Sequence, residues 1–265
     1  MKFSVLYIGD IVGEPGRDAI EELLPALQKE LQPDLVLANG ENATHGRGLS
    51  LGHYKALSKL GIDGFSTGDH VWKHDDLVTE LDNPSVMVTR PANYPKAPGR
   101  GFLDFTVKGK RVRLINLQGR VFMKENLDNP FLTFDRIVAE QPATDAIIVD
   151  FHAEATSEKR AFAEYVDGRA QLVVGTHTHV PTSDSQILAS GTAFISDLGM
   201  TGPKDSCLGA DKSEIVKSFL TGLPWRYTVG AGQCELGAVF STIDFESKMA
   251  VSIEPIRRFT KAQNT

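Results

Sequence analysis

Short apolar runs alternate with helix-spaced segments over roughly the first 80 residues of the chain. The apolar runs span residues 3–8, 34–38 and 62–67. Apolar positions recur at helical intervals over residues 17–31 and 51–60, and a more polar helical segment covers 73–81. Strands that alternate with helices predict a parallel sheet covered by helices. Pro25 lies inside the first helical segment and predicts a kink or a break there.

The pattern changes in the middle of the chain. Apolar and polar residues alternate over 102–107 and 111–117 on either side of Lys108-Gly109-Lys110, which is typical of an antiparallel hairpin. The further predicted strands are 146–149, 172–174, 192–196 and a hairpin of 235–243 with 250–256, and the further predicted helices are 131–140, 157–166 and 213–220. No linker rich in proline, glycine or serine divides the chain. We therefore expect a single α/β domain over residues 1–265, with one mixed sheet or two packed sheets.

Side chains that can bind metals follow five of the predicted strands. They are Asp10, Glu41, Asn42, Asp69, His70, His152, His177 and His179. Because ligands collect at the carboxyl ends of strands in open α/β sheets, we expect these segments to meet in space. In a strand-like extension, His177 and His179 would also point to the same side, since side-chain direction repeats every two residues.

The chemistry of this set narrows the choice of metal. Carboxylate, amide and imidazole ligands without a thiolate suit manganese, iron or zinc and argue against a structural zinc cluster. Seven or eight candidate ligands are too many for one ion, so the set predicts two ions that share one carboxylate. Glu154 follows His152 closely, and it is expected either to orient that imidazole or to begin the next helix.

Each of these side chains also has a structural interpretation when taken alone. Asp10, Glu41 and Asp69 each lie between a strand and a helical segment, where a carboxylate often caps a helix or forms a turn. His177 and His179 would also fit a loop in which their imidazoles are hydrogen-bonded, and His152 would fit the hydrophobic core. Their shared position after strands favours the metal interpretation.

Charge and composition exclude some partners. The 265-residue chain has a net charge of −6 and no basic stripe, so we expect no nucleic-acid polymer as a partner. A small phosphorylated substrate stays compatible, because metal ions supply the positive charge that the sequence lacks. Two cysteines are too few for a disulfide framework. The N-terminus has no basic and apolar leader pattern, and no apolar run approaches about 18 residues, so we expect a cytoplasmic protein without a membrane partner.

Seven ordered motifs carry a resemblance to a known family. Those at the candidate ligands are Gly9-Asp10, Asn39-Gly40-Glu41-Asn42, Gly68-Asp69-His70, Asp150-Phe151-His152-Ala153-Glu154 and Gly175-Thr176-His177-Thr178-His179, and the others are Arg90-Pro91-Ala92-Asn93-Tyr94-Pro95 and Gly119-Arg120-Val121-Phe122-Met123. Through these motifs, nearly the whole chain resembles the YmdB-like family of calcineurin-type metallophosphoesterases. The resemblance implies a four-layer α-β-β-α sandwich, a dinuclear metal site and phosphodiesterase activity on small cyclic nucleotides, with the 2′,3′-cyclic forms first. It also implies a homo-oligomer and iron, with manganese or zinc as alternatives.

The resemblance assigns a role to each candidate residue. One ion would be held by Asp10, Glu41, Asn42 and His179, and the other by Glu41, Asp69, His152 and His177. Glu41 would therefore bridge the two ions. His70 would stand beside the reacting phosphate as a general acid or an electrostatic stabiliser.

Two positions depart from the patterns of the family and its superfamily. The superfamily's first motif is Asp-x-His, whereas Asp10-Ile11-Val12 lacks the histidine and Asn42 takes its place. The family's third motif normally reads Gly-Asn-His, whereas this chain has Asp69. The departure at Asp69 leaves the identity of the metal and the reaction rate undecided, whereas the predicted fold does not depend on it.

The same residues support this chemistry without reference to the family. Two metal ions roughly 3.5–4 Å apart generate a hydroxide near neutral pH and clamp both oxygens of an in-line displacement at phosphorus. His70 would protonate the leaving ribose oxygen, a role that suits a group titrating at about pH 6–7. Two other functions stay open: a dinuclear hydrolase of amides or carboxylic esters, and a non-enzymatic or weakly active oligomeric regulatory protein that retains the metal site.

Overall fold

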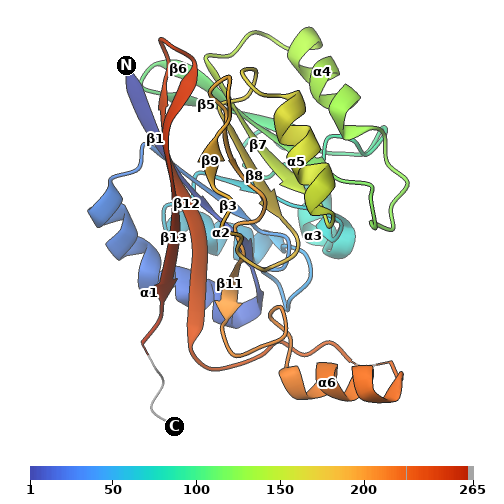
Figure 1. Ribbon diagram of the computed structural model, residues 1–265. Helices are drawn as coiled ribbons and strands as arrows, with labels where there is room; N and C mark the ends of the chain where they lie inside the picture. The colour runs from blue at the N-terminus through green and yellow to red at the C-terminus, as the bar shows by residue number, and fades with distance from the viewer. Residues whose placement is uncertain (225, 262–265) are drawn as a thin grey trace.

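Two β-sheets lie face to face in the computed structural model, which describes residues 1–224 and 226–261 (Figure 1). The strands of the first sheet are β1 (Lys2–Ile8), β2 (Asp10–Ile11), β3 (Leu35–Asn39), β4 (Gly64–Ser66), β11 (Met200–Pro203), β12 (Cys234–Asp244) and β13 (Met249–Phe259). Their order is β2-β11-β12-β1-β3-β4, and β13 pairs with β12. The second sheet has the order β5-β6-β7-β8-β10-β9. Its strands are β5 (Phe102–Val107), β6 (Lys110–Gln118), β7 (Ala146–His152), β8 (Leu172–Thr176), β9 (Gln186–Ile187) and β10 (Ala193–Ile195).

Three stacked core clusters show that the protein has four layers. Successive side chains of a strand point to opposite faces, so each sheet contributes to two clusters. Val5 and Tyr7 of β1 pack with Leu114 of β6 between the two sheets. Leu6 of β1 packs against α1 (Gly13–Leu31) and α2 (Leu51–Lys59) on one outer face. Ile115 of β6 packs against α4 (Pro130–Glu140) and α5 (Thr156–Tyr165) on the other.

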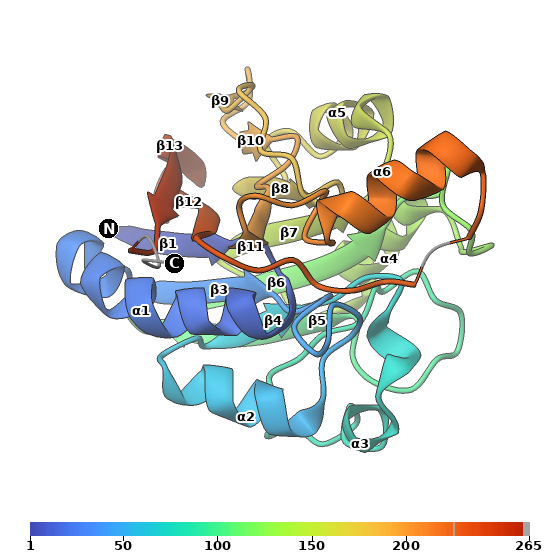
Figure 2. The ribbon, with the colours of Figure 1, turned by 90° about the horizontal axis from the view of Figure 1, so that it is seen from below.

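The views of the ribbon agree with these contacts. Figure 2 shows α1 and α2 on one side of the stacked sheets and α5 on the opposite side. The predicted α-β-β-α sandwich is therefore confirmed, and of the two sheet arrangements that the sequence allowed, the protein has two packed sheets.

Parallel strands form the centre of the second sheet and one side of the first sheet, out to its edge strand β4. In the first sheet β1, β3 and β4 are parallel, and β12 joins β1 in the antiparallel direction. In the second sheet β6, β7, β8 and β10 are parallel, and β5 and β9 add antiparallel edges. Several carboxyl ends of strands consequently lie close to one another, which is the arrangement that the sequence predicted for the candidate ligands.

The first helix differs from its prediction. It begins at Gly13 rather than at Arg17, and it continues through Pro25 without a break. Pro25 lies on the exposed side of α1, as does Glu21, whose carbonyl loses a hydrogen-bond donor four residues further on. Water can solvate that carbonyl, so the helix tolerates the proline.

Other predicted boundaries also move. The predicted helix over residues 73–81 is a 3₁₀ turn, η1 (Val71–Lys73), followed by a single short helix, α3 (Asp75–Val78). The strand predicted to end at Val149 continues to His152, so this histidine lies on β7 itself. The short strands β2, β9 and β11 were not predicted, because two to four residues are too few to establish an alternating pattern.

One helix stands apart from these layers. Helix α6 (Lys212–Thr221) projects from the body of the protein in Figure 1, and none of its described residues is buried. Asp211 caps its N-terminus by accepting hydrogen bonds from the backbone N–H groups of Ser213 and Glu214. Among the helices of residues 1–224 and 226–261, we find none with the length and apolar character that a membrane span requires.

Candidate metal centre

The eight predicted site residues gather where strands of both sheets end. Asp10, Glu41, Asn42, Asp69 and His70 follow strands of the first sheet, whereas His152, His177 and His179 end or follow strands of the second. A chain of contacts between 2.9 and 3.9 Å runs through them and their hydrogen-bond partners. The predicted convergence is therefore found. Their roles as ligands stay predictions.

Three of the predicted ligands form a compact group at the second sheet. Asp69, His152 and His177 each offer one atom within 4.8 Å of the others, a spacing that can hold a metal ion. Asp69 Oδ1 lies 3.3 Å from His152 Nε2 and 3.6 Å from His177 Nδ1, and the two imidazole nitrogens are 3.1 Å apart. Burial lowers the pKa of His152 to about 4 and also lowers that of His177. Both imidazoles are thus neutral at neutral pH, as metal ligands must be.

A second group joins the two sheets. Asn42 Oδ1 lies 3.2 Å from His179 Nε2, and Asp10 Oδ1 lies 3.9 Å from the same nitrogen. Asp10 is fully buried, yet its Oδ1 has no hydrogen-bond partner among the described residues. Burial, followed by the charges of Asp197 and Asp150, raises the pKa of Asp10 well above its usual value. An unpartnered buried carboxylate oxygen beside an amide oxygen and an imidazole fits a bound cation, which would keep Asp10 ionised.

Glu41 connects the two groups. Its side chain is buried, and it accepts hydrogen bonds from the backbone N–H groups of Gly68 and His70. Burial raises the pKa of Glu41 to about 7, although its contact with the His70 side chain opposes the rise. Glu41, Asp69 and His70 each offer an atom within 4.8 Å of the others. This position between the groups is compatible with a bridging carboxylate.

His70 lies at the wall of the site rather than inside it. A quarter of its side chain is exposed, with Nδ1 3.2 Å from Glu41 Oε1 and Nε2 3.6 Å from Asp69 Oδ2. Burial alone would lower the pKa of His70, but the hydrogen bond to Glu41 and the negative charges of Glu41 and Asp69 raise it above the usual value. These distances suit a metal ligand as well as a general acid, so the predicted chemical role of His70 stays a prediction.

A buried carboxylate beneath the site fixes the orientation of His152. Asp150 accepts hydrogen bonds from Thr176 Oγ1 at 2.7 Å and from Asn39 Nδ2 at 2.9 Å. It also accepts from Tyr7 and Ser66, so one carboxylate ties strands of both sheets together. Because the Thr176 hydroxyl donates to Asp150, it accepts from His152 Nδ1, which lies 2.9 Å away. The lone pair of His152 is then on Nε2, which faces Asp69.

The segment that carries the last two histidines is not extended. The strand ends at Thr176, and both His177 (φ 96°) and His179 (φ 65°) have left-handed backbone conformations. The prediction that a strand-like extension aligns the two imidazoles is therefore wrong. They still converge because Asp197 accepts hydrogen bonds from both the backbone N–H and the hydroxyl of Thr178, which curls the loop.

Asp197 has a buried partner of its own. Lys159 Nζ of α5 lies 2.7 Å from Asp197 Oδ2, and both side chains are 1% exposed. Asp197 Oδ1 also accepts the backbone N–H of Gly199 at 2.8 Å. Sequence reasoning missed both charged residues. Asp197 directly follows the predicted strand 192–196, so the rule that found the other carboxylates also points to it.

The predicted role of Glu154 needs a correction. Its Oε2 lies 3.3 Å from His177 Nε2, whereas the prediction had Glu154 either orient His152 or begin the next helix, and α5 begins only at Thr156. The reason is that Thr176 already occupies His152 Nδ1 from below. Since His177 Nδ1 faces Asp69, a hydrogen bond from Nε2 to Glu154 would leave the inner nitrogen free to bind a metal.

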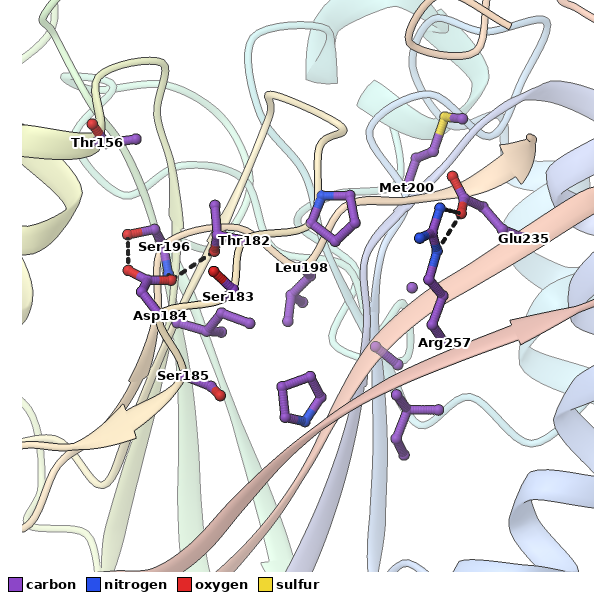
Figure 3. A pocket seen from close by; sticks show the side chains of 16 residues that line it. Thr156, Thr182, Ser183, Asp184, Ser185, Ser196, Leu198, Met200, Glu235 and Arg257 are labelled. Carbon is purple, nitrogen blue, oxygen red and sulfur yellow. Dashed lines mark hydrogen bonds and ion pairs between the residues drawn. The ribbon is translucent and has the colours of Figure 1, made fainter. Parts of the chain in front are cut away.

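Two large cavities border this loop. The first, of about 670 Å³, lies over the candidate ligands, and Glu41, Asp69, His70, His177 and His179 line it. The second, of about 810 Å³, is lined in part by residues 181–185, which follow the loop, and is shown in Figure 3. Its described lining includes none of the eight predicted site residues.

The carboxylates of the second cavity are already paired. Asp184 accepts hydrogen bonds from Thr182 and Ser196, and Glu235 contacts Arg257, as the dashed lines of Figure 3 mark. Among its described lining residues, the larger cavity thus offers no unpaired carboxylate, imidazole or thiol for a metal ion, and the smaller cavity is the candidate active site.

Comparison with known proteins identifies the family. Residues 6–256 match the family described as YmdB-like protein. The chain belongs to this family. It is 48% identical over 254 residues to the 2′,3′-cyclic-nucleotide 2′-phosphodiesterase of Bacillus subtilis strain 168, and the match covers 95% of this chain and 96% of the relative.

Solved structures of similar proteins agree with the fold. A hypothetical protein from Thermus thermophilus is 41% identical with a TM-score of 0.91, and the match covers 97% of this chain and all of that one. A phosphatase from Mycoplasma pneumoniae is 35% identical with a TM-score of 0.92, and the match covers 98% and 94% of the two chains. The YmdB-like family that the motifs indicated is thus confirmed over nearly the whole chain.

Proposed function

We propose that this protein is a metal-dependent phosphodiesterase that hydrolyses 2′,3′-cyclic nucleotides at the 2′ ester bond. The observation that carries the proposal is the convergence of buried carboxylates and neutral imidazoles around Asp10, whose Oδ1 is unpartnered in the described structure. The name of the Bacillus subtilis relative supports the substrate and the bond that is cleaved. We take residues 1–265 as one catalytic domain.

The ligand sets follow the two groups of side chains. Asp10, Asn42 and His179 would hold one ion, Asp69, His152 and His177 the other, and Glu41 both. The donors are oxygen and nitrogen atoms only, which suits iron, manganese or zinc, and the family resemblance makes iron the first candidate. When bound, two such ions supply Lewis acidity at the phosphate and activate water for an in-line displacement.

The protein's own residues prepare the site for an anionic substrate. Glu41, Asp69 and Glu154 line the cavity, and Arg47 is the single lysine or arginine among its described lining residues. An empty site of this charge would repel a phosphodiester, so substrate binding depends on the metal ions. His70 lies at the wall and its pKa is raised, and we assign to it the donation of a proton to the leaving 2′ oxygen.

A turnover panel tests this function. We expect metal-loaded protein to convert 2′,3′-cyclic AMP to the 3′-phosphate, as followed by ³¹P NMR, to hydrolyse an aryl phosphodiester, and to leave p-nitrophenyl acetate intact. Hydrolysis of the acetate without turnover of any phosphodiester would point instead to an amide or ester hydrolase. Binding of 2′,3′-cyclic AMP without turnover would favour the regulatory protein.

The remaining expectations about partners have their own tests. We propose a homo-oligomer in the cytoplasm with no nucleic-acid polymer as partner, on the basis of the family resemblance and the net charge of −6. Light scattering measures the molecular mass in solution, and a mass of one chain would contradict the oligomer.

A further inference from the structure

The cavity over the candidate metal centre has one polar wall and one apolar wall. The polar wall carries the candidate ligands together with Glu154 and Arg47. The apolar wall, as we use the term, consists of Val180, Leu208, Ile215 and Phe219. Val180 directly follows the candidate ligand His179, and the other three belong to α6 and the loop before it.

The apolar wall exposes much of its surface to water. Phe219 is 87% exposed, and Leu208 and Val180 are each about half exposed. Large apolar side chains gathered at the mouth of a cavity often mark a binding surface, because covering them removes apolar area from water. The position of this wall at a cavity of about 670 Å³ indicates a ligand that enters the cavity.

A direct contact holds the apolar wall at a fixed place relative to the candidate ligands. His179 Nδ1 lies 2.9 Å from the carbonyl oxygen of Leu208, and it donates to that oxygen. The lone pair of His179 is then on Nε2, which faces Asn42 and Asp10. Leu208 itself has a left-handed backbone (φ 55°) that turns its carbonyl toward the histidine. The site that would hold the phosphate and the apolar wall are therefore joined through a single side chain.

The two walls differ in charge, so they suit different chemical groups of a ligand. A phosphate group belongs at the metal ions, since the polar wall is otherwise acidic. The apolar wall offers neither charge nor side-chain hydrogen-bond donors, so it suits a flat and uncharged group. A nucleoside cyclic phosphate has this division, with an anionic ring at one end and a planar base at the other.

We propose that Phe219 and Leu208 form the platform on which the nucleobase of the substrate stacks. The inference rests on the proposed function and deepens it, because it names the residues that would bind the base of the nucleotide. Stacking on an aromatic side chain tolerates every base, so the platform selects for a base without selecting strongly among bases.

The test compares a substrate that has a base with one that lacks it. The pair is 2′,3′-cyclic AMP and methyl ribofuranoside 2′,3′-cyclic phosphate, both measured with metal-loaded protein. We expect Phe219→Ala to lower kcat/KM for 2′,3′-cyclic AMP by about tenfold, mainly through KM, and to leave the base-free substrate unchanged. Phe219→Trp should retain the preference for the nucleotide. Val216→Ala, on the same helix but outside the cavity lining, should change neither substrate.

Several results would overturn the platform. One is an equal loss on both substrates in Phe219→Ala, and such a loss together with a changed mass in light scattering would assign Phe219 to a contact between copies. Wild-type protein that turns over both substrates equally well would overturn the platform while leaving the proposed function intact. If neither substrate is hydrolysed, the proposed function fails.

In that case, equilibrium binding of 2′,3′-cyclic AMP tests the platform separately from turnover. Weaker binding to Phe219→Ala than to wild-type protein supports the platform, and equal binding overturns it.

Discussion

The polar and apolar walls of the candidate active site are held in place in opposite ways. Behind the polar wall, Asp150 and Asp197 are buried and hydrogen-bonded to residues of several strands and loops. The part of the apolar wall on α6 and its preceding loop is attached through the Leu208 carbonyl and through backbone hydrogen bonds of Gly209 and Asp211, while α6 has no buried residue in its described length. Phosphoryl transfer needs metal-ligand atoms that are fixed to within fractions of an ångström. Stacking of a base tolerates a surface that is held by fewer buried contacts.

The sharpest test of the polar wall removes its central carboxylate. Glu41→Ala should lose both metal ions or leave them loosely bound, because Glu41 lies between the two ligand groups. Turnover should then fall by more than the roughly 10–100-fold that the loss of an outer-shell partner costs, because the reaction depends on the metal ions. Elemental analysis and 2′,3′-cyclic AMP hydrolysis on one sample measure both effects.

A matched variant controls for charge in the same cavity. Glu154→Ala removes another carboxylate that lines the cavity but is about half exposed, and because Glu154 contacts His177, it should weaken at most the ion at His177 and keep the ion at Asp10, Asn42 and His179. Two tightly bound ions per chain in Glu41→Ala would contradict the bridging role.

The second test separates chemistry from metal binding within the polar wall. His70→Ala should retain its metal ions and lose roughly 10²–10⁴ in kcat, the usual contribution of a general acid. Metal content that drops to half of the wild-type value would show that His70 is a ligand, a role that its contacts with Glu41 and Asp69 also allow.

The third test concerns the support behind the polar wall. Asp197→Asn keeps the size of the side chain but leaves the Lys159 ammonium buried without a countercharge. We expect the free energy of unfolding to fall by about 3–5 kcal/mol. We also expect metal affinity to fall, because Thr178 loses its anchor between His177 and His179. Denaturant titration of chelated protein and metal titration measure the two effects.

The neighbouring ion pair on α5 is the control for Asp197. Arg160 and Glu164 form an exposed pair one turn apart, so Arg160→Met should change the free energy of unfolding by less than about 0.5 kcal/mol. Equal effects of Asp197→Asn and Arg160→Met would mean that the buried pair does not hold the loop.

The smallest expected effect comes from the departure at Asp69. Asp69 Oδ2 lies 3.6 Å from His70 Nε2 and helps to raise the pKa of His70. A general acid must be protonated, so activity declines as the pH rises through the pKa of His70. Asp69→Asn removes that negative charge and lowers the pKa, and the alkaline limb of the pH–rate profile should move to lower pH by up to about one unit. An unchanged limb would contradict either the contact or the acid role of His70.

The sequence predicted the candidate site better than its support. The position of ligand-type side chains after strands sufficed to find the gathered set from Asp10 to His179, because parallel strands bring their ends together whatever their exact register. Asp150 and Lys159 were missed as supporting residues, since their roles depend on partners in other strands and loops. Lys159 in particular has the sequence pattern of an exposed helix position, yet it is buried against Asp197.

The fold shows the same division between local and distant information. Most strands and helices were predicted within a few residues, because apolar periodicity is local. The backbone conformation of His177 and His179 was not predicted, since it depends on hydrogen bonds to Asp197, which is distant in sequence. Likewise, α6 was predicted as a helix near residues 213–220, but periodicity says nothing of its place beside the cavity.

A metal titration of chelated protein tests the central claim most directly. Chelated protein should not hydrolyse 2′,3′-cyclic AMP, and the rate should rise with added metal until two ions are bound per chain, with the 3′-phosphate as product. Full turnover by protein that contains no metal would contradict the claim. So would protein that binds two ions per chain and hydrolyses no phosphodiester.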